Sequence, residues 1–201
     1  MKWFWNPTYT LDAQFLIKNI FTIQNSRNYR RDNLIIETFL ITGIRRTELS
    51  NINIQDINFE ENQMTVIGKG NKERTIYLNK ACIKAIKEYM LVRPKEGIKK
   101  DSKNSDKALF LSERRQRISR RMVQEIIYTE LKQAGIDSQK YSVHKLRHTA
   151  ATLMYQYGGV DIRALQELLG HESISTTEIY THVSNQQVRN AVESNPLAEE
   201  N

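Results

Sequence analysis

"LLGHESISTTEIYTHV", residues 168–183, places His171, directly after Gly170, nine residues ahead of Tyr180. A run of small hydroxyl residues stands between the histidine and the tyrosine. The apolar residues of this stretch are spaced to cover one face of a helix, so most of it needs no functional explanation. One tyrosine among nine decides nothing by itself. The role of the stretch therefore depends on which other residues the chain sends to the same place.

Composition limits the possible classes of protein. The chain has 201 residues, 39% of them hydrophobic, which is enough for one large domain or for one domain with extensions. Thirty Lys and Arg against 23 Asp and Glu give a net charge of +7, which favours a polyanionic partner such as DNA or RNA. The single cysteine, Cys82, excludes an internal disulfide and a Cys-rich metal site. The chain shows neither a signal peptide nor a membrane-spanning run, so we expect a cytoplasmic protein with no membrane partner.

Apolar residues recur at helical spacing along most of the chain, and an alternating pattern marks a short β region. We predict an α+β fold that is mainly α-helical and carries one small three-stranded antiparallel sheet. The charged segment 93–107 is expected to be a mobile loop. The predicted helices cover residues 10–21, 30–43, 45–52, 80–92, 119–135, 141–158, 161–170 and 175–183, and the predicted strands cover residues 56–59, 64–67 and 74–78.

The stretch "SVHKLRHTAAT" predicts an anion site at a helix N-terminus. If Ser142 caps the helix, His144 and Arg147 share a face near free N–H groups and the positive end of the helix dipole. One solvated and one packed histidine are an equally good explanation. A zinc site formed by His144 and His148 is disfavoured, because Lys145 stands where the protease motif has a glutamate.

Two further basic features lie on either side of the first predicted strands. Arg45 follows the glycine that ends a predicted helix, where its side chain can project into a cleft, although a pair of solvated arginines is the simpler explanation. Lys69 lies between two glycines at the tip of a predicted hairpin, which is either an ordinary basic turn or a probe of a DNA groove. "GKGNK" is not a phosphate-binding P-loop, since it lacks the Gly-Lys-Ser/Thr ending and a following helix.

Taken together, these residue types suit metal-free phosphoryl transfer. About a thousandth of an unperturbed tyrosine is ionised at neutral pH, so a nucleophilic Tyr180 needs a base or cationic neighbours. Guanidinium groups match the oxygens of a phosphodiester in pairs, and a lysine on a hairpin can deliver a proton to the departing sugar oxygen. The chain shows no carboxylate cluster that would hold magnesium.

Four motifs, in this order and spacing, resemble the catalytic domain of the tyrosine recombinases, the phage integrase family. They are "TGIRRTEL", "VIGKGNKERTIYL", "HKLRHTAATLM" and "LLGHESISTTEIYTHV", and the resemblance runs from about Thr10 to Val183. It implies an enzyme that breaks and rejoins double-stranded DNA through a 3′-phosphotyrosyl intermediate, without metal, ATP or another cofactor. The catalytic residues that it implies are Arg45, Lys69, His144, Arg147, His171 and Tyr180.

The resemblance also implies how these residues share the work at the scissile phosphate. Tyr180 attacks the phosphate, and Arg45 and Arg147 clamp its oxygens. His171 donates a hydrogen bond to the same phosphate. The link to the tyrosine keeps the energy of the phosphodiester bond, so strands can be exchanged and resealed.

Two of the implied residues move protons. Lys69 would protonate the leaving 5′ oxygen, and His144 would handle the proton of the nucleophile and contact the phosphate. Glu48 is expected to support the helix that carries the clamp. Basic residues outside the site are expected to contact backbone phosphates, so binding should weaken steeply with salt. These residues are Arg30, Arg31, Lys72, Arg74, Arg114, Arg115, Arg117, Arg120 and Arg121.

The expected domain organisation has three parts: a lead-in at 1–9, the catalytic domain at 10–183 and a tail at 184–201. Members of the family usually carry a helical DNA-binding domain before the catalytic one, so we expect a catalytic fragment or a truncated member. Such a chain would be a monomer or weak oligomer alone, and the full-length protein would form a tetramer on DNA. The tail is either a segment that packs on a neighbouring subunit or a short helix with a frayed acidic end.

The sequence leaves several functions open. The form of the last motif favours an integrase of a phage or mobile element. A chromosome-dimer resolvase of the same family and a type IB topoisomerase-like relaxing enzyme are the alternatives, since both would use the same phosphotyrosine. A basic DNA-binding module without catalysis is the remaining one.

Overall fold

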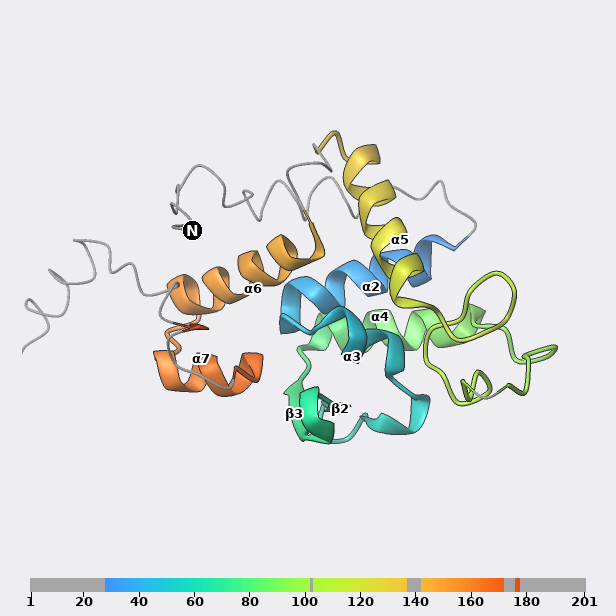
Figure 1. Ribbon diagram of the computed structural model, residues 1–201, viewed down its shortest axis with the longest axis horizontal. Helices are drawn as coiled ribbons and strands as arrows, with labels where there is room; N and C mark the ends of the chain where they lie inside the picture. The colour runs from blue at the N-terminus through green and yellow to red at the C-terminus, as the bar shows by residue number, and fades with distance from the viewer. Residues whose placement is uncertain (1–27, 102, 137–141, 172–175, 178–201) are drawn as a thin grey trace, which may run out of the picture.

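The computed structural model describes residues 28–101, 103–136, 142–171 and 176–177. Helix α2 (Tyr29–Thr42) lies at the centre and packs against α4 (Lys80–Val92), α5 (Arg120–Gln133) and α6 (Val143–Tyr157) (Figure 1). The short helix α3 (Arg46–Asn51) packs on α5, and α7 (Ile162–Leu169) packs on α6. No helix among these residues is long and apolar enough to cross a membrane.

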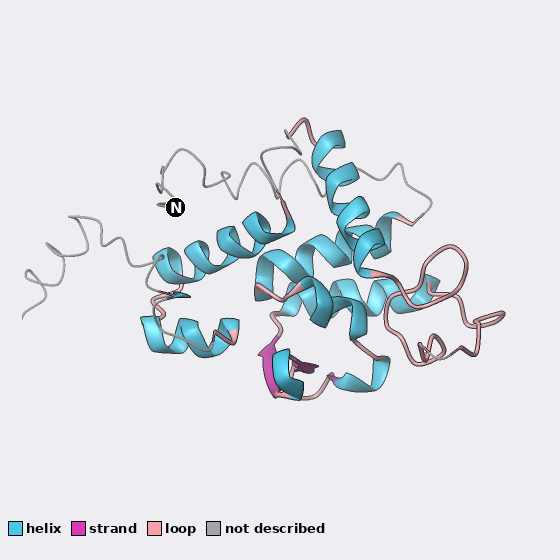
Figure 2. Ribbon diagram, viewed as in Figure 1, coloured by secondary structure: helices cyan, strands magenta, loops and turns pink. Residues whose placement is uncertain are grey.

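A small sheet lies next to α3, which contacts its strand β2 (Figure 2). It consists of β1 (Ile57–Asn58), β2 (Gln63–Ile67) and β3 (Glu73–Tyr77), all antiparallel and in chain order. Single turns of 3-10 helix, η2 (Ile54–Asp56) and η3 (Lys69–Asn71), precede β1 and join β2 to β3. This arrangement confirms the predicted fold class.

Most predicted boundaries agree with the structure within a few residues, and the helix predicted at 80–92 is confirmed at both ends. The first strand is shorter than predicted. The Asp56 carboxylate accepts a hydrogen bond of 2.8 Å from the backbone N–H of Asn53, which keeps Asp56 in the η2 turn and outside the strand. The helices predicted at 10–21 and 175–183 lie outside the described residues, apart from Thr176 and Thr177.

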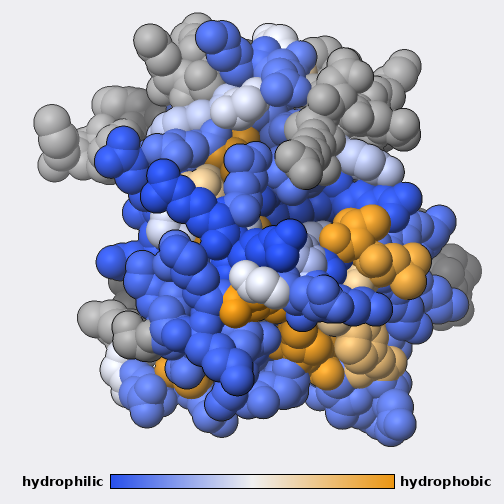
Figure 3. Space-filling view, turned by 90° about the vertical axis from the view of Figure 1, so that its right-hand side faces the viewer, coloured by the Kyte–Doolittle hydropathy of each residue, from blue (hydrophilic) through white to orange (hydrophobic). Residues whose placement is uncertain are grey.

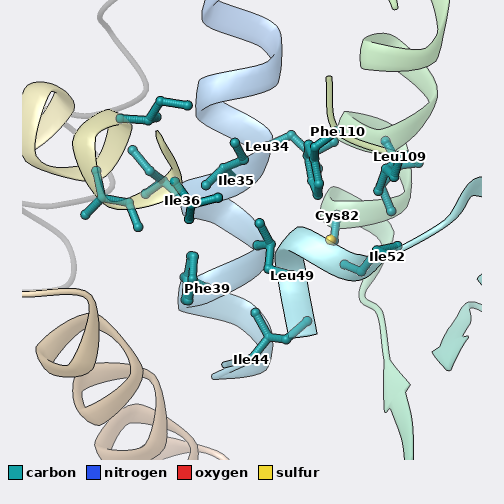
Figure 4. Packing of buried hydrophobic residues seen from close by; sticks show 14 of the residues in the cluster. Leu34, Ile35, Ile36, Phe39, Ile44, Leu49, Ile52, Cys82, Leu109 and Phe110 are labelled. Carbon is teal, nitrogen blue, oxygen red and sulfur yellow. The ribbon is translucent and has the colours of Figure 1, made fainter. Parts of the chain in front are cut away.

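The main core is built around α2, as Figure 4 shows. Leu34, Ile35 and Phe39 are fully buried on this helix, against side chains from α3, α4 and the segment around Phe110. Burying each such side chain contributes about 1.5–3 kcal/mol to the free energy of unfolding. Cys82 is also buried there, and burial raises the pKa of its thiol to about 12, so it packs as a small apolar residue.

The long segment between α4 and α5 is irregular, as predicted, but two arginines fix it to the core. Arg93 is buried and donates hydrogen bonds to the carbonyls of Ala108 and Leu109. Arg117 donates to the carbonyl of Ile52 and to the side chain of Asn53. Viewed from the side of this loop, the surface is mostly hydrophilic, with hydrophobic residues in separate patches (Figure 3).

Candidate active site

The site is built on the C-terminal end of α7. The carboxylate of Asp161 caps the N-terminus of this helix by accepting from the N–H groups of Arg163 and Ala164 at 2.8 and 2.9 Å. At the other end, Gly170 adopts φ +65°, a left-handed conformation that turns the chain out of the helix. The last carbonyls of α7 therefore point out of the helix with the negative end of its dipole.

Three arginines from distant parts of the chain donate to these carbonyls. Arg147 of α6 donates to Leu169 O at 2.7 Å, Arg74 of β3 donates to Leu168 O, and Arg45 donates to Gly170 O. The three guanidinium groups thus gather around one short stretch of backbone. A concentration of positive charge of this kind is suited to binding a phosphate.

The turn after α2 brings the two predicted clamp arginines together. Gly43 ends α2 with φ +59°, and Arg45 then occupies the N-cap position of α3. Arg147 also donates to Gly43 O, which links this turn directly to α6. A side chain at Gly43 would place its Cβ 2.9 Å from Leu169 Cδ2, and the positive φ itself favours glycine at this turn. Arg147 is only 8% exposed, whereas the Arg45 side chain is 32% exposed.

A buried carboxylate orients the arginines. Glu48, with 1% of its side chain exposed, accepts from the Arg45 guanidinium, from the Arg45 backbone N–H and from the Arg74 guanidinium, each at 2.8 Å. Burial alone would raise the pKa of Glu48, but the hydrogen bonds and charges of Arg74 and Arg45 outweigh it and lower that pKa. Glu48 is therefore ionised, and it has the supporting role that the sequence predicted.

His171 follows Gly170 and remains neutral. Its Nδ1 lies 2.9 Å from the hydroxyl of Thr177, which is fully buried. Burial, together with the charges of Arg147, Arg45 and Arg74, lowers the pKa of His171 to about 4. A neutral imidazole has one N–H donor and one acceptor nitrogen. If the Thr177 hydroxyl donates to Nδ1, then Nε2 carries the proton and can donate to an anion.

A cleft of about 740 Å³ lies at this end of α7. Arg45, Arg74 and His171 belong to its wall, together with Gly68 and Lys72 from the hairpin between β2 and β3. Among the residues that the structure describes, no group of three or more His, Cys, Asp or Glu side chains could hold a metal ion. The lining is cationic and rich in N–H donors, which suits the oxygens of a phosphodiester.

His144 stands on the first turn of α6, exposed to solvent and one turn before Arg147. The helix begins after Ser142, as predicted, but the Ser142 side chain makes no capping hydrogen bond. The first turn therefore lacks the side-chain acceptor that we expected. The prediction that His144 shares a helix face with Arg147 agrees with this spacing.

Comparison with known proteins identifies the family. Residues 13–187 match the phage integrase family. The chain belongs to this family. It is 60% identical over 170 residues to "Tyrosine recombinase XerC" of Caldanaerobacter subterraneus subsp. tengcongensis, covering 85% of this chain and 46% of the relative. Across the first relatives found, the chain spans about half of their length.

Solved structures of the family agree with the fold. The crystal structure of the XerA recombinase superposes with a TM-score of 0.72 at 32% identity, over 95% of this chain and 64% of that one. The XerH recombinase bound to its difH substrate, in a pre-cleavage complex, gives a TM-score of 0.74 at 29% identity, over 98% and 54%. The tyrosine recombinases thus share both sequence and architecture with this chain.

The roles of all six predicted catalytic residues remain predictions, and the side chains of two of them are not described. Lys69 lies in the η3 turn between β2 and β3, but its side chain is not among those described. Tyr180 lies outside the described residues. The described part of the site thus brings together Arg45, Arg147 and His171.

The basic residues predicted to contact DNA outside the site fall into different environments. Arg31 is buried, pairs with Asp32 at 2.8 Å and donates to Leu111 O, so its side chain is committed to the core. Arg117 is likewise committed to the Ile52 carbonyl and the Asn53 side chain. Arg30 is half-buried and lies 5.6 Å from the ring of Tyr29. The exposed members of the set are Lys72, Arg114, Arg115, Arg120 and Arg121.

Arg74 is the main correction to the predicted site. We expected it outside the site, on a backbone phosphate, but it lies within the cleft, bonded to Glu48 and α7. The alternation along β3 carried the signal, because Arg74 shares a face with the buried Ile76. Thr177, which bonds to His171, gave no such signal, since the contact depends on tertiary structure.

Proposed function

We propose that this chain is the catalytic domain of a site-specific tyrosine recombinase of the Xer type, which resolves chromosome dimers. The support comes from the 60% identity to a XerC protein, together with the likeness to the XerA and XerH recombinases. These relatives favour a dimer resolvase over the integrase of a phage or mobile element that the last motif suggested. The observation that carries the chemistry is the convergence of Arg45, Arg147 and His171 on the end of α7.

In the proposed reaction, the Tyr180 hydroxyl attacks the scissile phosphorus and forms a 3′-phosphotyrosyl bond. The bond to the 5′ oxygen breaks, and Lys69 donates the proton that this oxygen needs. His144 takes the proton of the tyrosine. The free 5′ hydroxyl of a partner strand then reverses the step, so the number of phosphodiester bonds is conserved.

Arg45, Arg147 and neutral His171 stabilise the charge that builds on the non-bridging oxygens. The guanidinium groups are oriented before DNA arrives, because Glu48 and the α7 carbonyls already hold them. Preorganised donors of this kind are each worth about 10²–10³ in rate. Arg45 uses only part of its N–H groups in the bonds described, so donors remain for a phosphate.

The test uses the full-length protein and a nicked suicide substrate that carries the host recombination site. Wild-type protein should form a covalent adduct that survives denaturation, and Tyr180→Phe should form none while keeping the same circular dichroism spectrum. An adduct with the phenylalanine variant would exclude Tyr180 as the nucleophile.

A plasmid with two recombination sites then separates recombination from relaxation, since only recombination joins two distinct duplexes. Unresolved chromosome dimers in a deletion strain would support the resolvase role, and their absence would favour an integrase.

A further inference from the structure

We infer that Arg74 is a positioning residue for the cleavage step, which docks the β2–β3 hairpin against the end of α7. The hairpin carries Lys69 and α7 leads into His171, so this contact sets the distance between two groups of the proposed reaction. The inference rests on the proposed function.

The sheet register directs Arg74 inward. Arg74 pairs with Val66 of β2, and Ile76 pairs with Met64. Val66, Ile76 and Met64 are all buried, at 3% exposure or less, so Arg74 occupies the inner face of the hairpin. Only 14% of its side chain is exposed. A charged group in this place must be paired, since burial without partners is unfavourable.

Arg74 joins three elements. Its guanidinium pairs with Glu48 of α3 at 2.8 Å and donates to Leu168 O of α7. Among the described residues, the bond to Leu168 is the hydrogen bond that crosses from the hairpin to α7. The same carboxylate also binds Arg45, so the position of the hairpin and the orientation of the clamp arginine depend on one shared partner.

The fit of Arg74 across the helix end is tight. A side chain at Gly170 would place its Cβ 2.9 Å from Arg74 Cδ and 3.0 Å from Arg74 Nε. Gly170 therefore both ends α7 and leaves room for the arginine. The Nε of Arg74 is buried and has no hydrogen-bond partner among the described residues. A buried N–H donor without a partner does not stabilise the free protein. The unpartnered Nε therefore favours a role of Arg74 in the site over a purely structural role.

The position of the hairpin matters because η3 is short and Lys69 is its first residue. The backbone N–H of Gly68 donates to Lys72 O at 2.8 Å, which closes the turn, so a shift of β3 moves the whole turn with it. Loss of the Arg74 contact would let Lys69 move away from the leaving oxygen. It would leave Arg147 and its own bonds to Gly43 and Leu169 in place.

The experiment compares two suicide substrates with the full-length protein. One has the normal 5′ oxygen at the cleaved bond, and the other has a bridging 5′ sulfur, which leaves as a thiolate and needs no proton. We expect Arg74→Met to slow cleavage of the oxygen substrate by about 10²-fold, the usual contribution of a general acid. On the sulfur substrate its rate should return close to that of wild type, as should that of Lys69→Ala.

Further variants make each outcome decisive. Arg74→Lys keeps a charge beside Glu48 but cannot span both acceptors, so it should show the same selective defect to a smaller degree. Arg121→Met removes an exposed arginine and should lower both rates alike, through binding only. Arg45→Ala should stay slow on both substrates.

The inference is overturned if Arg74→Met is equally slow on both substrates, which would place Arg74 at the phosphate or in folding. It is also overturned if that variant cleaves both like wild type. Thermal melts separate a folding defect from a defect at the site. If wild-type protein forms no adduct with either substrate, the proposed function itself fails. If Lys69→Ala is not restored by sulfur, the general acid is misassigned and the inference fails with it.

Discussion

Arg93 and Arg147 are both almost completely buried, and both donate hydrogen bonds to backbone carbonyls, yet they do different things. Arg93 bonds to Ala108 and Leu109, within the loop that begins at its own position. Arg147 bonds to Gly43 and Leu169, which lie 104 and 22 residues away in sequence. Burial and bonding therefore do not distinguish a structural arginine from one in a site.

The neighbours make the distinction. Burial lowers the pKa of Arg93. The titratable side chain whose charge acts on Arg93 is that of Tyr89, which is never a cation. Arg147 stands with Arg45 and Arg74, whose combined charges help to keep His171 neutral. Like charges that gather on one spot repel, and the single carboxylate of Glu48 offsets only part of the charge of three guanidinium groups, so the spot still favours an anion. The predictions below test this contrast.

The largest expected effect comes from exchanging the two arginines for methionine. Arg147→Met should slow DNA cleavage by about 10²–10³-fold, as expected for loss of one preorganised donor. Arg93→Met should lower the free energy of unfolding by about 2 kcal/mol, because charged hydrogen bonds to the loop are lost, while its folded fraction cleaves normally. Urea unfolding and single-turnover cleavage measure the two effects. If both variants lose stability and activity in parallel, the contrast is wrong.

Glu48→Gln should destabilise the protein by about 3 kcal/mol, because it removes the buried charge that the guanidinium groups of Arg45 and Arg74 share. Glu125→Gln, which removes the exposed partner of Arg121, should change stability by less than about 0.5 kcal/mol.

The pKa of Glu48 is lowered in the folded state, so its stabilising effect is full above the ordinary carboxyl pKa. It is lost as the pH falls through the folded value. Equal free energies of unfolding for Glu48→Gln and Glu125→Gln would contradict the stabilising role of Glu48.

Thr177→Val should reduce cleavage by about fivefold, the effect of losing one hydrogen bond of about 1 kcal/mol. The reason is that the Thr177 hydroxyl no longer selects which ring nitrogen of His171 carries the proton. Thr177→Ser keeps the hydroxyl and should retain most of the activity. Nitrogen-15 chemical shifts of His171 report the tautomer directly, and an unchanged tautomer in the valine variant would refute the assignment.

The smallest effect concerns pH. Because the folded-state pKa of His171 is lowered to about 4, His171 should stay neutral through pH 5–8 in an NMR titration. The unfolded chain binds this proton near its ordinary pKa of about 6.5, so the contribution of His171 to stability is full above that value. It falls between about 6.5 and about 4. Titration of His171 near 6.5 in the folded protein would show that the three arginines do not surround it.

Much of the fold was accessible from sequence because it depends on local patterns. The apolar spacing of residues 80–92 predicted that helix to both ends, and glycine after residue 42 predicted the end of α2. The local pattern failed where one side chain competed with it: Asp56 bonds to the Asn53 N–H and shortens the first strand. Ser142 stands at the start of α6 as predicted, without the capping bond.

The sequence by itself determined the family, because four spaced motifs carry the residue types that the chemistry requires, and it determined the helices and the sheet through hydrophobic periodicity. Tertiary structure alone decided which arginines form the site. Arg74 reaches α7 and Arg31 turns into the core, although both were expected on DNA. The reason is physical: the surroundings of a side chain depend on how distant elements pack, and the end of α7 meets Arg45, Arg74 and Arg147 only after folding.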